Sequence, residues 1–174
     1  SFALQSDGKP VIGGYISNAA QQSSSYAVMR FNVDGTVDTS FGNGGTVFEN
    51  VGTHYSAGGY IVIQPDGKII IAGSSASQLP NEGVDYLVAR LTADGQRDTT
   101  FNGTGYVSYT IGNAFDWTNA VALQPDGKIV LVGRSNSHSN NQYDIGVLRL
   151  NTNGSLDTTF NETGIAKIGD AAVS

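Results

Sequence analysis

The residues whose side chains could most readily bind or react are three arginines and three aspartates that recur at one spacing. Each arginine lies between apolar neighbours, and an aspartate follows it at the same distance along the chain. The pairs are Arg30 with Asp38, Arg90 with Asp98, and Arg149 with Asp157. A buried guanidinium without a partner is very costly, so the spacing predicts an arginine–carboxylate or arginine–carbonyl contact within each repeat. The alternative is a ring of arginines that binds an anion.

The turn residues around the first two aspartates are similar in type to a calcium loop. Asn32, Asp34 and Asp38 offer oxygen ligands at short intervals, and Gly35 lies between them. The bidentate glutamate that closes such a loop is absent. Asx turns and Asp-Gly hairpins explain the same residues. The sequence therefore predicts no cofactor, with calcium as the alternative.

Aromatic, acidic and histidine side chains lie where the repeats differ from one another. Variable loops on a rigid scaffold are where binding usually resides, and aromatic rings stack on sugars or anchor partners. For Trp117, the only tryptophan, two interpretations stay open: ligand contact, or filling of the gap between the second and third repeats. The candidate ligand-binding residues are Tyr15, His54, Tyr55, Asp116, Trp117, His138 and Tyr143.

The two histidines form no recognisable catalytic arrangement. His54 and His138 occur once each, and no serine or carboxylate partner recurs with them. Neither has a second ligand at the spacing that zinc sites use. An enzyme would also need convergent titratable groups, and the variable loops hold few. We therefore predict that the chain has no metal site and is not an enzyme.

A threefold repeat positions these residues and fills the chain of 174 residues. Gln5-Ser6-Asp7-Gly8-Lys9 returns as Gln-Pro-Asp-Gly-Lys at 64–68 and at 124–128. Self-similarity at a fixed period is the signature of a repeat architecture. The register predicts a single repeat domain over 1–174, divided into repeats 1–59, 60–119 and 120–174.

Each repeat has the pattern of four short strands. Asp-Gly between two apolar runs predicts a hairpin, because glycine takes the positive φ that the turn needs. The run Ile69–Ala72 is apolar throughout, which indicates burial on both faces. The prediction is an all-β fold of three β-propeller blades with four antiparallel strands each, and a β-solenoid is the alternative.

The predicted connections differ between the two ends of a blade. Strands one and two, and strands three and four, are joined by connections expected to be short and nearly identical. The connections between strands two and three (15–25, 74–84 and 134–143) are expected to be variable loops that gather on the opposite face, together with the segments between blades. That loop face is the predicted binding surface.

Two long motifs at fixed spacing resemble the bacterial delta-60 repeat. The first is Ala-Leu-Gln-Pro-Asp-Gly-Lys-Ile-Val at 122–130. The second is Asp-Gly-x-x-Asp-Thr-Thr/Ser-Phe, as at 94–101, followed by Gly-x-Gly. The resemblance implies β-propeller blades of large secreted or cell-surface proteins, without a common activity. Copy 1 departs from the motif at Ser6 and Pro10, and copy 3 departs at 161–163.

The charge and composition of the chain argue against two classes of partner, nucleic acids and the membrane interior. The net charge is −6 and the isoelectric point is about 4.6, which argues against nucleic acid, since that partner needs a basic stripe. No apolar run reaches membrane-spanning length, so no membrane insertion is predicted. The expected function is a non-catalytic extracellular module that binds a glycan or a protein through its loop face. The alternative is a self-assembling scaffold.

Three repeats are fewer than a closed propeller contains, which is roughly four to eight blades. Residues 1–5 match the second half of a first strand, and residues 170–174 match the first half of one. We therefore expect these blades to be part of a larger ring or to be completed by another copy of the chain. Head-to-tail completion by a second copy would give six blades, or a filament if the contact did not close.

Overall fold

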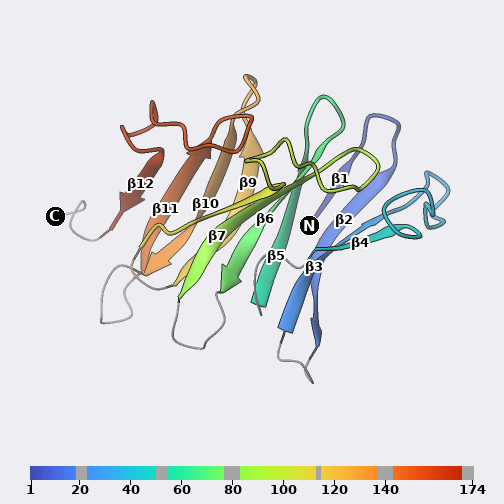
Figure 1. The fold of residues 1–174 in the computed structure, drawn as a ribbon, viewed down its shortest axis with the longest axis horizontal. Helices are drawn as coiled ribbons and strands as arrows, with labels where there is room; N and C mark the ends of the chain where they lie inside the picture. The colour runs from blue at the N-terminus through green and yellow to red at the C-terminus, as the bar shows by residue number, and fades with distance from the viewer. Residues whose placement is uncertain (19–22, 50–54, 77–82, 113–114, 137–142, 170–174) are drawn as a thin grey trace.

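A computed structural model describes residues 1–18, 23–49, 55–76, 83–112, 115–136 and 143–169. The described residues form three antiparallel sheets of four consecutive strands, which lie side by side in chain order (Figure 1). We call these sheets blades 1, 2 and 3. The predicted all-β fold with three four-stranded blades is therefore confirmed.

The strands have the same order in every blade. Blade 1 contains β1 (Phe2–Leu4), β2 (Pro10–Asn18), β3 (Ser23–Arg30) and β4 (Thr46–Glu49). Blade 2 contains β5 (Tyr55–Ile63), β6 (Ile69–Ala76), β7 (Val84–Leu91) and β8 (Tyr106–Tyr109). Blade 3 contains β9 (Asp116–Leu123), β10 (Ile129–Asn136), β11 (Tyr143–Leu150) and β12 (Ile165–Ile168).

The repeated Gln-x-Asp-Gly-Lys phrase forms the turn between the first two strands of a blade. In blade 1, Gly8 N donates to Gln5 O at 2.9 Å, and Gln5 N donates to Lys9 O at 3.0 Å. Gly8 has a φ of 84°, a conformation in which glycine carries no steric cost. The Asp7 carboxylate accepts from Lys9 N at 3.1 Å and stabilises the turn further. The hairpin prediction is confirmed.

The connection between the third and fourth strands is longer than the sequence predicted. In blade 1 it covers residues 31–45 and contains two successive turns, in which Gly35 N donates to Asn32 O and Phe41 N donates to Asp38 O, both at 3.0 Å. Between these turns Asp38 N returns to Arg30 O at 3.0 Å. The prediction of a short connection was wrong, because the chain folds back to place this aspartate beside β3.

The second and third strands extend into segments predicted as variable loops. Tyr15–Asn18 continue β2, and in the ladder with β3 Ser17 pairs with Ser24. Backbone hydrogen bonds hold a ladder, so polar residues continue it beyond the apolar run. The parts of the predicted loops that lie between strands, 19–22, 77–82 and 137–142, fall outside the described residues.

The predicted repeat boundaries lie inside strands. Position 59/60 falls within β5 and position 119/120 within β9, so blades 2 and 3 begin before the repeats do. Register shifts mark both places, between Gly58 and Tyr60 in β5 and opposite Val132 and Gly133 in β10. A Cβ at Gly59 would lie 2.6 Å from Gly14 N, so β5 and β2 approach closely at the first shift.

The blades pack face to face through two apolar layers. Ile69 and Ile71 of β6 face blade 1, while Ile70 and Ala72 face blade 3, and all four are almost fully buried. Burial of both faces is what the uninterrupted apolar run predicted. Each inner strand of blade 2 thus meets a neighbouring blade on either side, as in a propeller.

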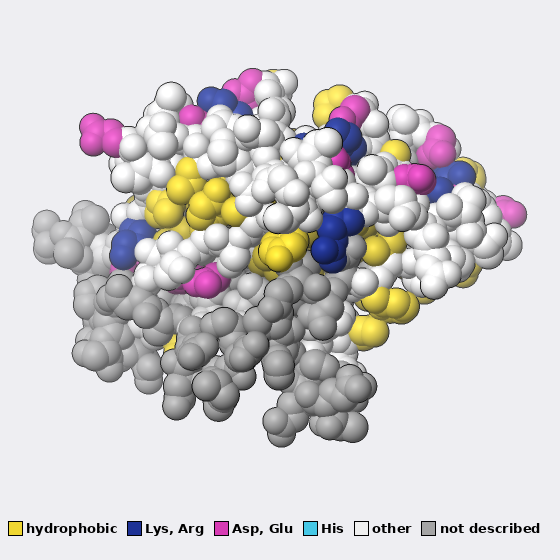
Figure 2. All heavy atoms as spheres, in the orientation of Figure 1, with side chains coloured by type: hydrophobic (Ala, Val, Ile, Leu, Met, Phe, Trp, Pro, Cys, Tyr) yellow, Lys and Arg dark blue, Asp and Glu magenta, His cyan; other side chains and the backbone are white. Residues whose placement is uncertain are grey.

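The surface carries few charges. In Figure 2, Lys, Arg, Asp and Glu side chains appear as small separate groups among larger uncharged areas. The described residues contain no helix of the length and apolar character needed to cross a membrane.

Candidate functional site

Each blade holds a cluster of one arginine, one aspartate and one lysine at the end of its third strand. In blade 2, Arg90 Nε donates to Asp98 Oδ2 at 2.7 Å, and Lys68 Nζ lies 3.2 Å from the same oxygen. The matching clusters are Lys9, Arg30 and Asp38 in blade 1, and Lys128, Arg149 and Asp157 in blade 3. We call these three groups the ion clusters. The arginine–carboxylate contact that the sequence predicted is present in each.

The Arg90 guanidinium is fixed from several directions. It lies over the Phe101 ring, 4.8 Å from the centroid, and Nη2 donates to Thr100 Oγ1 at 2.9 Å. Its Nη1 donates to Thr152 O, in the turn after β11, at 2.7 Å. Arg30 reaches Ala93 O of blade 2 in the same way, at 2.7 Å. The first two clusters therefore join successive blades as well as their own strands.

The aspartates of the ion clusters remain ionised at neutral pH. Burial by itself would raise the pKa of Asp98. Hydrogen bonds from Thr100 and Lys68, with the charge of Arg90, outweigh this and hold the pKa at about 2. Hydrogen bonds from Lys9 and Ser40 hold the pKa of Asp38 well below its usual range. Thr159 and Lys128 have the same effect on the pKa of Asp157.

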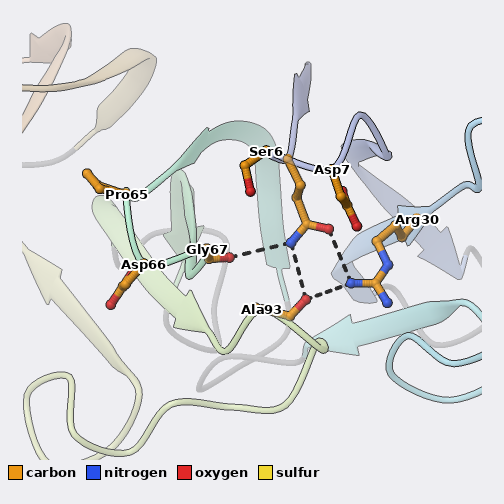
Figure 3. A pocket seen from close by; sticks show the side chains of 8 residues that line it. Ser6, Asp7, Arg30, Pro65, Asp66, Gly67 and Ala93 are labelled. Carbon is orange, nitrogen blue, oxygen red and sulfur yellow. Dashed lines mark hydrogen bonds between the residues drawn. The ribbon is translucent and has the colours of Figure 1, made fainter.

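A cleft of about 330 Å³ lies between the turns of blades 1 and 2, beside the first ion cluster (Figure 3). Arg30 Nη1 donates to Gln5 Oε1 at 3.2 Å, and Gln5 Nε2 donates to Ala93 O at 3.2 Å. Figure 3 shows these bonds linking the turn of blade 1 to that of blade 2. The Arg30 donors are thus used within the protein, which favours a structural staple over an anion site.

The carboxylates of the calcium-like segment serve different partners. Asp34 Oδ1 accepts from Thr36 N at 3.0 Å and from Thr36 Oγ1 at 2.6 Å. Asp38 belongs to the ion cluster of blade 1. Among the described residues, no group of three or more His, Cys, Asp or Glu side chains is placed to hold a metal ion.

Two of the predicted ligand residues meet at an arginine on the outer face of blade 3. The Arg134 guanidinium lies 5.7 Å from the Trp117 ring and 5.1 Å from the Tyr143 ring. Arg134 and Tyr143 are exposed and Trp117 is half-buried. We call these three residues the aromatic cluster. It presents ring faces and guanidinium donors together, which suits sugars and carboxylates.

The position of Trp117 decides between its two interpretations. Its neighbour Thr118 donates through Oγ1 to Gly73 O of blade 2 at 2.6 Å, so Thr118 faces blade 2. Successive side chains of a strand point to opposite faces. Trp117 therefore faces away from blade 2, toward Arg134, and does not fill the gap between blades 2 and 3.

Asp116 is fully buried and its carboxylate is occupied. Oδ2 accepts from Ile111 N at 2.7 Å and from Gly112 N at 2.9 Å, while Oδ1 accepts from Gly112 N at 3.1 Å. These bonds bind the segment after β8 to the start of β9. Asp116 lies next to Trp117 in the chain, yet this carboxylate is not presented to solvent.

The other predicted ligand residues do not join the aromatic cluster. Tyr15 is exposed on β2 of blade 1, two blades away from Trp117. Tyr55 begins β5, but its side chain is outside the described part of the structure. His54 and His138 lie outside the described residues altogether.

The comparison with protein families gives a match that covers more than half of the chain. It is to the family described as "domain of unknown function (DUF5122) beta-propeller", at residues 5–41, 64–101 and 124–160. The chain belongs to the DUF5122 β-propeller family. Comparison with curated proteins gives no match.

Each DUF5122 segment contains one complete ion cluster. Each begins at the glutamine of the repeated phrase and ends at the phenylalanine that lies under the arginine, as Gln64 and Phe101 do in blade 2. The structure adds a role for the lysine of the phrase, which sequence reasoning assigned only to a hairpin. The sequence signal for this role is that the lysine recurs at a nearly constant distance before each aspartate of the ion clusters.

Arg134 is the second residue that sequence reasoning missed. Counted from the glutamine of each DUF5122 segment, it stands at the register of Tyr15 and Ser74. A cation that replaces a serine or a tyrosine at one repeat position is a departure visible in the sequence. The aromatic cluster thus arises where blade 3 differs from the other two.

Proposed function

We propose that the chain is a non-catalytic binding module, displayed outside a bacterial cell, which presents the aromatic cluster of blade 3 to a glycan or protein. The observation that supports it is the Arg134 guanidinium between the Trp117 and Tyr143 rings. The cluster combines an exposed cation with exposed ring surface on a chain of net charge −6. An acidic sugar or an acidic peptide segment fits this chemistry.

Each member of the cluster has a distinct part in binding. Tyr143 is 47% exposed, and its ring offers a flat apolar surface on which a sugar ring can stack. Arg134 offers forked donors to a carboxylate. Trp117, half-buried behind Arg134, limits the directions that the guanidinium can take. Such preorganisation reduces the entropy lost on binding.

Five buried ionisable groups with altered pKa values support the non-catalytic part of the proposal. Asp38, Asp98 and Asp157 have lowered pKa values and are held in the ion clusters. Burial raises the pKa of Tyr26 and Tyr86, and their hydroxyls donate to Ser74 O and Gly146 O. Each of these groups already has a structural partner.

A glycan array that includes neutral and acidic sugars tests the proposal. We expect binding of uronic or sialic acid glycans, with a loss of at least tenfold in affinity for Arg134→Ala and for Trp117→Ala. Tyr15→Ala is the matched control, since Tyr15 is an exposed tyrosine on blade 1. If Tyr15→Ala weakens binding while Arg134→Ala does not, the aromatic cluster is not the site. Pull-down with acidic peptides is the corresponding test for a protein partner.

A further inference from the structure

The two end blades each expose an apolar face. Blade 1 has a leading face, which points away from blade 2 and carries Phe2, Leu4, Ile12, Ile16 and Phe48, at 44% to 71% exposure. Blade 3 has a trailing face, which points away from blade 2 and carries Val132, Ile145 and Ile168. The two faces lie at opposite ends of the row of sheets in Figure 1.

The leading face of blade 1 repeats a surface that is buried inside the chain. Counted from the glutamine of each phrase, Phe2 and Ile12 stand at the register of Ile61 and Ile71 of blade 2. Ile61 and Ile71 are 5% and 1% exposed, because they pack against blade 1. Blade 1 thus has the kind of face that receives a preceding blade.

The trailing face of blade 3 repeats the other half of that contact. Val132 stands at the register of Ala72 of blade 2, and Ile145, which pairs with Arg134, corresponds to Tyr86, which pairs with Ser74. Ala72 and Tyr86 are fully buried against blade 3. One chain therefore exposes both complementary halves of an interface that it already forms twice, between blades 1 and 2 and between blades 2 and 3.

The ion cluster of blade 3 lacks the contact with a following blade that the other two ion clusters make. Arg30 and Arg90 each donate through Nη1 to a carbonyl of the following blade. Among the described residues, Arg149 Nη1 donates to no acceptor, and the Arg149 side chain is 19% exposed against 7% for Arg90. The carbonyl at the register of Ala93 and Thr152 in blade 1 is that of Val33, which is exposed.

A glycine in the blade 1 turn completes the pattern. A Cβ at Gly95 would lie 2.9 Å from the Phe41 ring of the preceding blade, and a Cβ at Gly154 would lie 2.9 Å from the Phe101 ring. Gly35 stands at the same register and has nothing within 4 Å of the added atom. Phe41 and Phe101 are fully buried, whereas Phe160 of blade 3 is only half-buried. Phe160 is therefore the ring with no glycine of a following blade packed on it.

We propose that two copies of this chain associate head to tail, with the trailing face of each blade 3 on the leading face of the other blade 1. In this contact Arg149 donates to Val33 O of the second copy, and Phe160 packs on its Gly35. Two copies give six blades, within the range of roughly four to eight in which propellers close, whereas three copies give nine. Arg134 pairs with Ile145 in the β10–β11 ladder, so the aromatic cluster lies on this same trailing face, next to the residues of the contact.

The test is the mass of the purified chain by sedimentation equilibrium. We expect twice the 18.2 kDa of one chain. Ile12→Asp places a charge on the apolar leading face, and Val132→Asp places one on the trailing face. Each variant alone is therefore expected to sediment as a monomer. An equimolar mixture retains one intact contact and should regain a dimer. A wild-type monomer that is folded by circular dichroism overturns the proposal, and a dimer of Val132→Asp alone overturns the head-to-tail arrangement.

A second pair of variants separates loss of assembly from loss of folding. In Gly35→Asn the new residue tolerates the positive φ of this position, and its side chain enters open space within the chain. The fold should therefore persist while the dimer is lost. Gly44→Asn is the matched control, because Gly44 also has a positive φ and open space, in a turn that the proposed contact does not include. Equal masses for the two variants contradict the role of Gly35.

Discussion

Arg90 Nε lies 2.7 Å from Asp98 Oδ2, and both side chains are more than 90% buried between blades 2 and 3. Removing one member of a buried ion pair leaves the other without its partner. We expect Arg90→Ala to lower the free energy of unfolding by about 3 kcal/mol, the lower end of the usual range, because Lys68 still neutralises Asp98. Urea denaturation measures the change.

Arg149→Ala is the matched comparison for Arg90→Ala. Arg149 contacts Asp157 within its own blade but, among the described residues, no carbonyl of another blade. Its loss should therefore cost less stability in the monomeric state. A stable Arg90→Ala variant that instead lost binding of an anionic ligand would favour the ring of anion-binding arginines.

The stability of the fold should decrease in acid. The pKa of Asp98 is lowered to about 2 in the folded chain, while an unfolded aspartate has a pKa of about 4. The unfolded state therefore binds more protons, and the stabilisation present above about pH 4 is lost as the pH falls toward 2. Urea midpoints measured at several pH values check this. In Asp98→Asn the loss of stability between about pH 4 and pH 2 should be smaller than in the wild type. An equal loss would mean that other groups cause the acid sensitivity.

Gly133→Ala should destabilise blade 3 strongly. An added Cβ would lie 2.6 Å from the Tyr86 hydroxyl and would clash with the Trp117 carbonyl. Overpacking of this kind costs roughly 1–3 kcal/mol. Gly14→Ala is the control at the same repeat register, since a Cβ there meets nothing within 4 Å. Thermal melting of the two variants, as monomers, should differ by several degrees, and equal losses would contradict the close approach of blades 2 and 3.

Asp116→Asn should weaken the fold without reducing ligand binding. The carboxylate accepts three hydrogen bonds from Ile111 N and Gly112 N, and an asparagine presents only one acceptor oxygen. The loss should be about 1–3 kcal/mol, measured by urea denaturation. If the variant kept its stability and lost glycan binding, Asp116 would be a ligand contact and not a structural residue.

The sequence predicts the blades well because the turn chemistry is explicit. The Asp-Gly dipeptides locate the hairpins, and the unbroken apolar run Ile69–Ala72 indicates the doubly buried strand β6. The arginine–aspartate contact also follows from sequence, because a charge between apolar residues needs a partner. These features rest on local rules that a single chain displays.

The ends of the strands and the aromatic cluster do not follow from such rules. Tyr15 and Tyr143 lie in polar segments that resemble loops, yet backbone ladders place both in strands. The contact of Arg134 with Trp117 depends on the register of β10 against β9, which a bulge shifts. A bulge moves every later side chain relative to its partner strand, and the sequence carries no direct mark of its position.

The outer strands β4, β8 and β12 are only four residues long. An edge strand offers unpaired backbone groups to other chains, and short edges are one means by which β proteins limit aggregation. At the opposite edges of blades 2 and 3, β5 and β9 are nine and eight residues long, so the short edges are those formed by β4, β8 and β12. Growth of the sheet sideways, the route to amyloid-like polymers, therefore has little template at the rim formed by β4, β8 and β12.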